Sequence, residues 1–138
     1  GYGRIGRLLA KKLGALGAKV TVAARSLEAR AWAQTEGSAA CSIEELDKAL
    51  PAFPLIFNTA PAEVLSEALL TRVRLDCLIV DLASKPGGID QLCARRLGLK
   101  TIWALSLPGK TAPYTAAQII AETVENIDAE RRRAYGAD

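Results

Sequence analysis

The chain has 138 residues, half of them hydrophobic, which is enough for one sizeable core and too little for two ordinary ones. None of its apolar runs approaches the ~20 residues that a membrane span needs, so no membrane partner is expected. The net charge of +3 is small. Its basic clusters at 95–96 and 131–133 lie near the ends of predicted helices, where cations suit the helix dipole, so no nucleic-acid partner is expected either.

Three cysteines, Cys41, Cys77 and Cys93, are scattered along the chain without a C-x-x-C spacing. An odd and scattered set of this kind is typical of small buried side chains in a reducing compartment. The sequence therefore predicts no metal site and a cytoplasmic location.

The first predicted element is a turn formed by the run Gly1-Tyr2-Gly3-Arg4-Ile5-Gly6. In a G-x-G-x-x-G turn the first glycine allows a tight bend, the second lets the backbone approach a diphosphate, and the third lets the helix pack against the sheet. Backbone N–H groups of the first helical turn then form an anion site, which makes Gly1, Gly3, Arg4, Ile5 and Gly6 the predicted binding residues. Glycines also mark ordinary turns, so the elements that follow decide the interpretation.

Those elements favour a dinucleotide-binding unit. An apolar stripe from Leu8 to Leu16 predicts a helix that ends at Gly17, and residues 19–24 predict a buried strand. Strand-like and helix-like patterns then alternate along the chain, which is typical of a parallel sheet covered by helices on both faces. Further strands are predicted at 38–41, 55–58, 77–82 and 101–105, and further helices at 27–35, 42–50, 61–73 and 89–97.

A final helix is predicted to begin at Thr111 as its N-cap, with Pro113 in the first turn. Its apolar residues recur at helical spacing, which predicts one buried face. That face consists of Ala116, Ile119, Ile120, Thr123, Val124 and Ile127.

The predicted fold class is therefore α/β, a Rossmann-like doubly wound parallel sheet that lacks its first strand. In the strand order 3-2-1-4-5-6 the first strand is central and ends at the first glycine, where this chain has no preceding residues. The strands on either side would face a gap with unpaired backbone groups. We therefore expect residues 1–138 to be one NAD(P)-binding domain of a longer polypeptide, whose upstream domain lies outside this chain.

The end of the second Rossmann strand selects the cofactor, because an acidic residue there binds a free ribose 2′-hydroxyl and repels a 2′-phosphate. This chain has Arg25 and Ser26 at that position. Arginine offers a planar set of donors for a phosphate, and Ser26 adds a hydroxyl, so NADP is favoured over NAD. The alternative is that Arg25 only begins the solvated face of the next helix, as is also expected of Arg30.

Three loops follow predicted strands, and ligands of open α/β sheets bind outside the carboxyl ends of the strands. Each loop is therefore expected to border the cofactor, although its glycines and prolines would also suit simple turns. For Asp81 we favour a structural role, in which its side chain caps the loop that follows. The predicted cofactor contacts are Asn58, Thr59, Ala60, Pro61, Asp81, Leu82, Ala83, Pro108 and Gly109.

The segments GYGRIGR, VAARS, FNTAP, VDLASKPGGID and LPGKTAPYTAAQI resemble the C-terminal NAD(P)-binding domain in the family of dipicolinate synthase A subunits. The resemblance runs from Gly1 to about Ile127, and it departs from the expected pattern at Tyr114 and Ala117. It implies an NAD(P)-dependent oxidoreductase that converts a dihydrodipicolinate-type precursor to dipicolinate during sporulation, in the mother-cell cytoplasm. It further implies an upstream domain and a flavoprotein-like partner, the B subunit.

For a small dicarboxylate substrate, Lys85 and Lys110 are the candidates to pair with the two carboxylates, with Ser84 and Thr115 as hydroxyl contacts. A solvated surface position is the alternative for both lysines. The chain has no histidine to carry a proton, but forming an aromatic ring needs less help from a base. A non-catalytic nucleotide sensor, or the cofactor domain of another oxidoreductase such as a D-2-hydroxyacid or methylenetetrahydrofolate dehydrogenase, remains an alternative. The sequence also leaves a homo-oligomer open.

Overall fold

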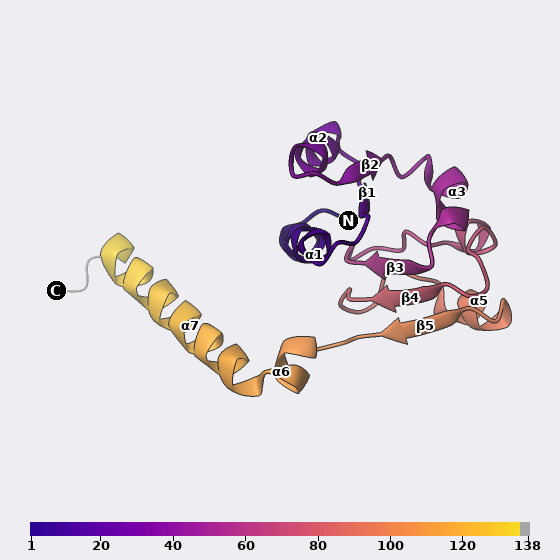
Figure 1. Ribbon diagram of the computed structural model, residues 1–138. Coiled ribbons are helices and arrows are strands. Elements are labelled where there is room, and N and C mark those ends of the chain that lie inside the picture. The colour runs from indigo at the N-terminus through magenta and orange to yellow at the C-terminus, as the bar shows by residue number, and fades with distance from the viewer. Residues whose placement is uncertain (136–138) are drawn as a thin grey trace. The chain divides into compact units, whose positions relative to one another are not determined.

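The structure is a computed structural model that describes residues 1–135. It divides into two compact units, the first formed by Gly1–Leu105 and the second beginning at Ser106. Figure 1 shows the order of the elements along the chain.

The first unit alternates helices and strands as the sequence predicts. Its strands are β1 (Thr21–Ala23), β2 (Ala39–Cys41), β3 (Leu55–Asn58), β4 (Leu78–Asp81) and β5 (Lys100–Trp103). Its helices are α1 (Arg4–Ala15), α2 (Leu27–Thr35), α3 (Leu46–Ala49), the 3₁₀ turn η1 (Leu50–Ala52), α4 (Glu67–Leu70) and α5 (Gln91–Arg96). All strand pairs are parallel, so the predicted α/β class is confirmed.

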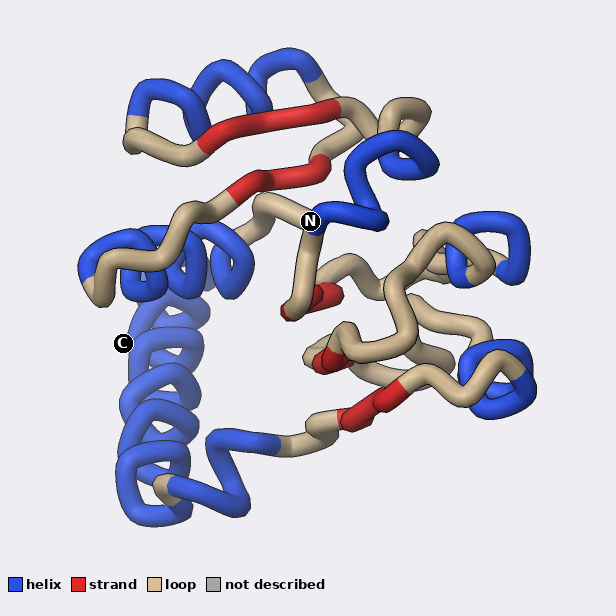
Figure 2. Tube along the Cα trace, turned by 45° about the vertical axis from the view of Figure 1, so that its right-hand side comes forward, coloured by secondary structure: helices blue, strands red, loops and turns tan. Residues whose placement is uncertain are grey.

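The strands form two separate sheets, β1-β2 and β3-β4-β5. Figure 2 shows the two sets of strands with the N-terminus between them. Gly1 connects the two sheets, because its amino group donates to the carbonyl of Ala23 (3.1 Å) and its own carbonyl accepts from Thr59 Oγ1 (3.1 Å). Within residues 1–135 no strand occupies the edge of β1 or of β3 that faces Gly1, which is the place of the central strand in the predicted order.

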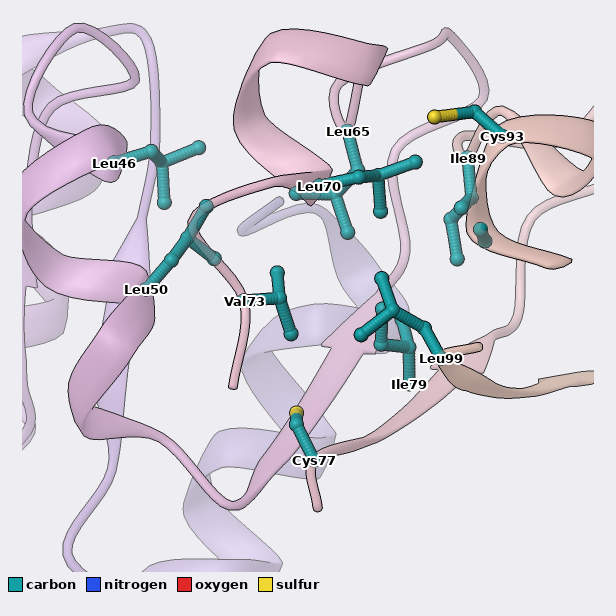
Figure 3. Close-up of a cluster of buried hydrophobic side chains, with 11 residues drawn as sticks. Leu46, Leu50, Leu65, Leu70, Val73, Cys77, Ile79, Ile89, Cys93 and Leu99 are labelled. Carbon is teal, nitrogen blue, oxygen red and sulfur yellow. The ribbon is translucent and has the colours of Figure 1, made fainter. Parts of the chain in front are cut away.

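The main core packs α3, α4 and α5 against one face of β3-β4-β5 (Figure 3). Cys77 and Cys93 are buried in it, as predicted, and burial raises the pKa of the Cys77 thiol. The whole cluster consists of Leu46, Leu50, Leu65, Leu70, Val73, Cys77, Ile79, Ile89, Cys93, Ala94 and Leu99. A smaller cluster of Ala10, Val22, Ala24 and Ala33 packs α1 and α2 against β1. Small side chains there bring the backbones close together.

Three predicted helices are shorter in the structure, and the one expected at 89–97 loses only its ends. The helix expected at 61–73 is reduced to α4, because the backbone N–H groups of Val64 and Leu65 donate to the carbonyl of Gly88 (both 3.0 Å) and hold this segment extended. The helix expected from Ser42 begins only at Leu46. The Ser42 N–H donates to Glu45 Oε2 (2.8 Å), which is one of the two hydrogen bonds of a capping box.

The second unit consists of α6 (Leu107–Thr111) and α7 (Pro113–Tyr135). Thr111 ends α6 instead of capping α7, and its hydroxyl donates to the carbonyl of Leu107 (2.8 Å). The predicted buried stripe is wrong for this structure, because Ile119, Ile120, Val124 and Ile127 are 53–64% exposed. The pattern is amphipathic, but within residues 106–135 the one other element of this unit is the short helix α6, which cannot cover that face. No helix described within residues 1–135 has the length and apolar character to span a bilayer.

Candidate cofactor site

The glycine turn packs directly against the loop after β3. A Cβ on Gly6 would overlap the carbonyl oxygen of Gly1 and approach Thr59 Oγ1 to 2.9 Å. A Cβ on Gly1 would likewise lie 2.8 Å from Thr59 Oγ1 and 3.2 Å from the Ala60 nitrogen. Gly1, Gly6, Thr59 and Ala60 are therefore brought together in the structure, and the two glycines are needed for internal packing.

Gly3 differs, because a Cβ there would meet nothing within 4 Å. Internal packing therefore does not explain this glycine, whereas close approach of a ligand would. Gly3 is also the N-cap of α1, where no side chain caps the helix and no acidic residue stands in the first turn. The leading N–H groups of the helix, at Arg4, Ile5 and Gly6, have no partner within the helix, which is what an anion site requires. The turn thus fits a diphosphate.

The turn after β1 presents Arg25 to solvent. The Arg25 side chain is exposed and makes no hydrogen bond or ion pair with another residue of the described chain. Ser26 is the N-cap of α2, and its Oγ accepts from the Ala29 N–H (3.2 Å). Arg30 was expected to be exposed, but it is half-buried and donates to two carbonyls of this turn.

A polar clamp joins the glycine turn to the far end of α2, and no pattern in the sequence indicates it. Glu36 accepts from the Tyr2 hydroxyl (2.5 Å) and forms an ion pair with Arg7 (Nη2–Oε1 2.5 Å). The Arg7 guanidinium also lies 5.1 Å from the centre of the Trp32 ring. These partners are far apart in sequence and no motif connects them, so only the folded chain reveals the clamp.

The clamp borders a shallow pocket of ≈ 230 Å³ between α1 and the start of α2, next to the turn that carries Arg25 and Ser26. Its lining is polar and aromatic. Because Glu36 neutralises Arg7, this pocket is not a cationic site of its own. The lining residues are Tyr2, Arg7, Ser26, Glu28, Ala29 and Trp32.

We expect the clamp to contribute stability in a pH-dependent way. The hydrogen bond from Arg7, and then that from Tyr2, hold the pKa of Glu36 below its ordinary value of 4.5. A depressed pKa stabilises the fold above the unfolded value, and this contribution is lost as the pH falls through the folded value. Glu36→Gln should therefore lower the thermal midpoint at pH 7, and the difference from the unmodified chain should shrink below about pH 4.5.

Thermal unfolding by circular dichroism at pH 7 and pH 3.5 measures this difference. Glu63→Gln is a matched control, because Glu63 is exposed and no hydrogen bond or ion pair of its side chain is found within residues 1–135. Its midpoint should stay close to that of the unmodified chain at both pH values. A Glu36→Gln deficit of the same size at both pH values would contradict a role for the carboxylate charge.

The loop after β4 is organised by a buried carboxylate. Asp81 is 0% exposed, and its Oδ1 accepts from Asn58 Nδ2 (2.8 Å) and from the Ala83 N–H (3.0 Å). Its Oδ2 accepts from the Gly88 N–H (2.9 Å). The expected capping of the loop by Asp81 is therefore confirmed. Because Asn58 and Asp81 are register partners on β3 and β4, this network lies at the carboxyl ends of both strands.

The same network presents the candidate substrate residues. Ser84 and Lys85 are exposed on the loop that Asp81 and Gly88 close, and the Lys85–Pro86 peptide bond is cis. Trp103 fixes the loop from β5, since its indole Nε1 donates to the carbonyl of Ala83 (3.0 Å). Of the remaining predicted contacts in these two loops, Pro61 is exposed and Leu82 is half-buried. A rigid frame with an exposed lysine and serine is suited to holding a small anion.

The other predicted site residues belong to the second unit. Pro108, Gly109 and Lys110 lie in α6, and Thr115 lies in the first turn of α7. Lys110 and Thr115 are exposed. Their contribution to the cofactor or substrate site stays a prediction.

The parallel strands, the uncapped helix after a glycine turn and the polar loops at the strand ends define an α/β fold of the Rossmann type. L-alanine dehydrogenase shares this fold, with a TM-score of 0.56 and 20% identity over 66% of this chain and 28% of that one. So does the quinone oxidoreductase of Thermus thermophilus, solved in complex with NADPH, with a TM-score of 0.58 and 21% identity over 87% of this chain and 41% of that one. At these identities the likeness shows the fold alone.

A closer similarity is to the A subunit of dipicolinate synthase from Bacillus subtilis (strain 168), with 38% identity over 130 residues. That match covers 94% of this chain and 44% of the relative. A crystal structure of the same subunit from Bacillus halodurans has a TM-score of 0.87 and 36% identity, covering 92% of this chain and 44% of that one. The Bacillus subtilis structure has a TM-score of 0.90 and 36% identity, covering 96% of this chain and 44% of that one. No protein-family model matches the chain.

The resemblance inferred from the loop motifs is therefore confirmed: over nearly all of its length the chain is similar to the dipicolinate synthase A subunit. The chain spans less than half the length of the relatives that it matches.

Proposed function

We propose that this chain is the cofactor-binding part of an NADP-dependent oxidoreductase that converts a dihydrodipicolinate-type precursor to dipicolinate. The observation that carries the proposal is the open backbone at Gly3, at the uncapped start of α1, in a chain similar to the dipicolinate synthase A subunit. The Rossmann-type fold supports an oxidoreductase with a nicotinamide cofactor.

In this proposal the backbone of Gly3, Arg4 and Ile5 holds the diphosphate at the N-terminus of α1. Arg25 supplies a free guanidinium for a 2′-phosphate, and NADP is therefore preferred over NAD. Ser26 contributes differently from our expectation, because its Oγ already accepts the Ala29 N–H as the N-cap of α2. Its hydroxyl hydrogen is still available to donate to a phosphate oxygen.

The substrate is a small dicarboxylate. When bound, NADP would accept a hydride from a ring carbon of the precursor while a ring proton leaves to water, so that the ring becomes aromatic and NADP becomes NADPH. The chain's own role is orientation and charge: Lys85 pairs with one carboxylate and Ser84 donates a hydrogen bond to it, both held by the frame around Asp81.

The whole reaction involves more than this chain. The relatives are named as the A subunit of a dipicolinate synthase, which supports a partner subunit, and we propose a flavoprotein-like B subunit. Because the chain spans 44% of the Bacillus subtilis relative, we further propose that the substrate domain belongs to the remainder of a longer polypeptide. The proposed location is the mother-cell cytoplasm of a spore former.

The function is tested by mixing the protein with the dihydrodipicolinate-type precursor and NADP and following absorbance at 340 nm. The proposal predicts a rise in absorbance that depends on the precursor, with dipicolinate as the product. Lys85→Met should slow this rise by raising KM more than it lowers kcat, because the lysine positions substrate in both ground and transition states. NADPH binding without any turnover of the precursor would instead indicate a nucleotide sensor.

Cofactor choice is tested by Arg25→Asp. An acidic residue at this turn binds a ribose 2′-hydroxyl and repels a 2′-phosphate, so the ratio of the NADPH and NADH dissociation constants should shift toward NADH by about 100-fold or more. Fluorescence titration of both dinucleotides measures the ratio. An unchanged ratio would remove Arg25 from the site.

A further inference from the structure

The turn that presents Arg25 is closed by a second arginine. Arg30 lies in the first turn of α2, and its Nη1 donates to the carbonyl of Ala24 (2.9 Å) and to the carbonyl of Arg25 (2.8 Å). Its side chain therefore runs back past the start of its own helix to the end of β1. One nitrogen binds two successive carbonyls, which fixes the peptide plane between them.

The surroundings of Arg30 hold it in this position. Arg30 is half-buried, and its backbone N–H donates to the carbonyl of Ser26 (3.3 Å). The pKa values of Glu44 and Glu45 lie below their ordinary value. The main cause is hydrogen bonding within the segment 42–45, and the positive charge of Arg30 adds to this effect. Arg30 is thus held by its own helix backbone and by the two carbonyls of the turn.

Arg25 and Arg30 therefore have different environments. The Arg25 side chain is exposed and has no hydrogen-bond or ion-pair partner within the described chain, whereas one nitrogen of Arg30 is occupied by two backbone acceptors. A bound phosphate at this turn would meet the free guanidinium of Arg25. Arg30 would act on it through the backbone that carries Arg25.

We propose that Arg30 is a positioning residue for nucleotide selection, which orients the Ala24–Ser26 turn so that Arg25 can receive the 2′-phosphate of NADP. This inference rests on the proposed function and assigns a second residue to the same site. NADPH binding depends on Arg30, whereas NADH binding does not, because NADH lacks the phosphate that the turn receives. If Arg30 had only a structural role, replacing it would weaken the binding of both dinucleotides together.

The test compares dissociation constants of NADPH and NADH for the unmodified chain and for Arg30→Met, with thermal unfolding as a check on folding. NADPH should bind about tenfold more weakly to Arg30→Met, which is the loss expected when Arg25 no longer makes one charge-assisted hydrogen bond to the phosphate. The dissociation constant of NADH should change by less than about twofold. Arg96→Met is the matched control, because Arg96 is exposed and pairs with exposed Glu67 on another helix. It should leave both constants unchanged.

A double-mutant cycle separates positioning from direct contact. If Arg30 acts through the turn that carries Arg25, then adding Arg30→Met to Arg25→Gln should weaken NADPH binding by less than about twofold further. A full further tenfold loss would show direct contact with the phosphate and overturn the inference. An unchanged NADPH/NADH ratio in Arg30→Met would overturn it as well. Equal affinity of the unmodified chain for the two dinucleotides would instead overturn the proposed NADP preference on which the inference rests.

Discussion

Replacing Asp81 by asparagine should destabilise the first unit by about 2–4 kcal/mol. The carboxylate is fully buried and accepts three hydrogen bonds, from Asn58, Ala83 and Gly88. An asparagine has nearly the same shape, but one of its two terminal atoms is an NH₂ group. Whichever way the amide turns, a donor faces a donor and a buried N–H group loses its acceptor. The thermal midpoint should fall by roughly 10 °C, measured by circular dichroism or calorimetry.

The matched control is Asp90→Asn. Asp90 is the N-cap of α5, and its Oδ1 accepts the Cys93 N–H (2.9 Å). Asparagine caps helices about as well as aspartate, so this variant should stay within about 0.5 kcal/mol of the unmodified chain. If Asp81→Asn lost no more stability than Asp90→Asn, this would show that the buried network does not hold the loop that carries Ser84 and Lys85.

Glycine-to-alanine replacements at three positions should separate effects on dinucleotide binding from effects on folding. At Gly6 a Cβ would overlap the Gly1 carbonyl oxygen, so the variant should lose about 1–3 kcal/mol of stability and bind no dinucleotide. At Gly3 the Cβ would meet no protein atom within 4 Å. Gly3→Ala should therefore remain within about 1 kcal/mol in stability and yet bind NADPH at least tenfold more weakly, because the new methyl group occupies the approach of the diphosphate.

Gly14→Ala is the control for this series. Gly14 lies within α1 and its Cβ would also meet nothing within 4 Å, so alanine should stabilise the helix by up to about 1 kcal/mol and leave NADPH binding unchanged. Thermal unfolding and fluorescence titration of the three variants give both quantities. Normal NADPH affinity in Gly3→Ala would place the diphosphate elsewhere.

The parts of the fold that could be predicted from the sequence are those set by short-range signals. The glycine run, the first helix and the alternation of helices with strands follow from spacing that each segment carries within itself. For the same reason Asp81 could be assigned to loop capping, since a carboxylate that follows a strand often binds the next backbone N–H groups. The register that makes Asn58 and Asp81 partners is consistent with that interpretation.

The parts that were missed depend on contacts between distant segments. Residues 61–65 have a helical pattern, but Gly88 accepts the N–H groups of Val64 and Leu65 and keeps this segment extended. The clamp of Tyr2, Arg7 and Glu36 joins residues up to 34 positions apart, and none of the three belongs to a recognisable motif beyond the glycine turn. The apolar face of α7 shows the reverse case. Its pattern predicts burial, but the described part of its unit, residues 106–135, leaves this face exposed.

In the proposed function the glycine turn and the Arg25 turn together hold NADP. A calorimetric titration of the unmodified chain with NADPH and, separately, with NADH tests it most directly. One NADPH should bind per chain, at least tenfold more tightly than NADH. Absence of NADPH binding at millimolar concentration, or tighter binding of NADH, would contradict it.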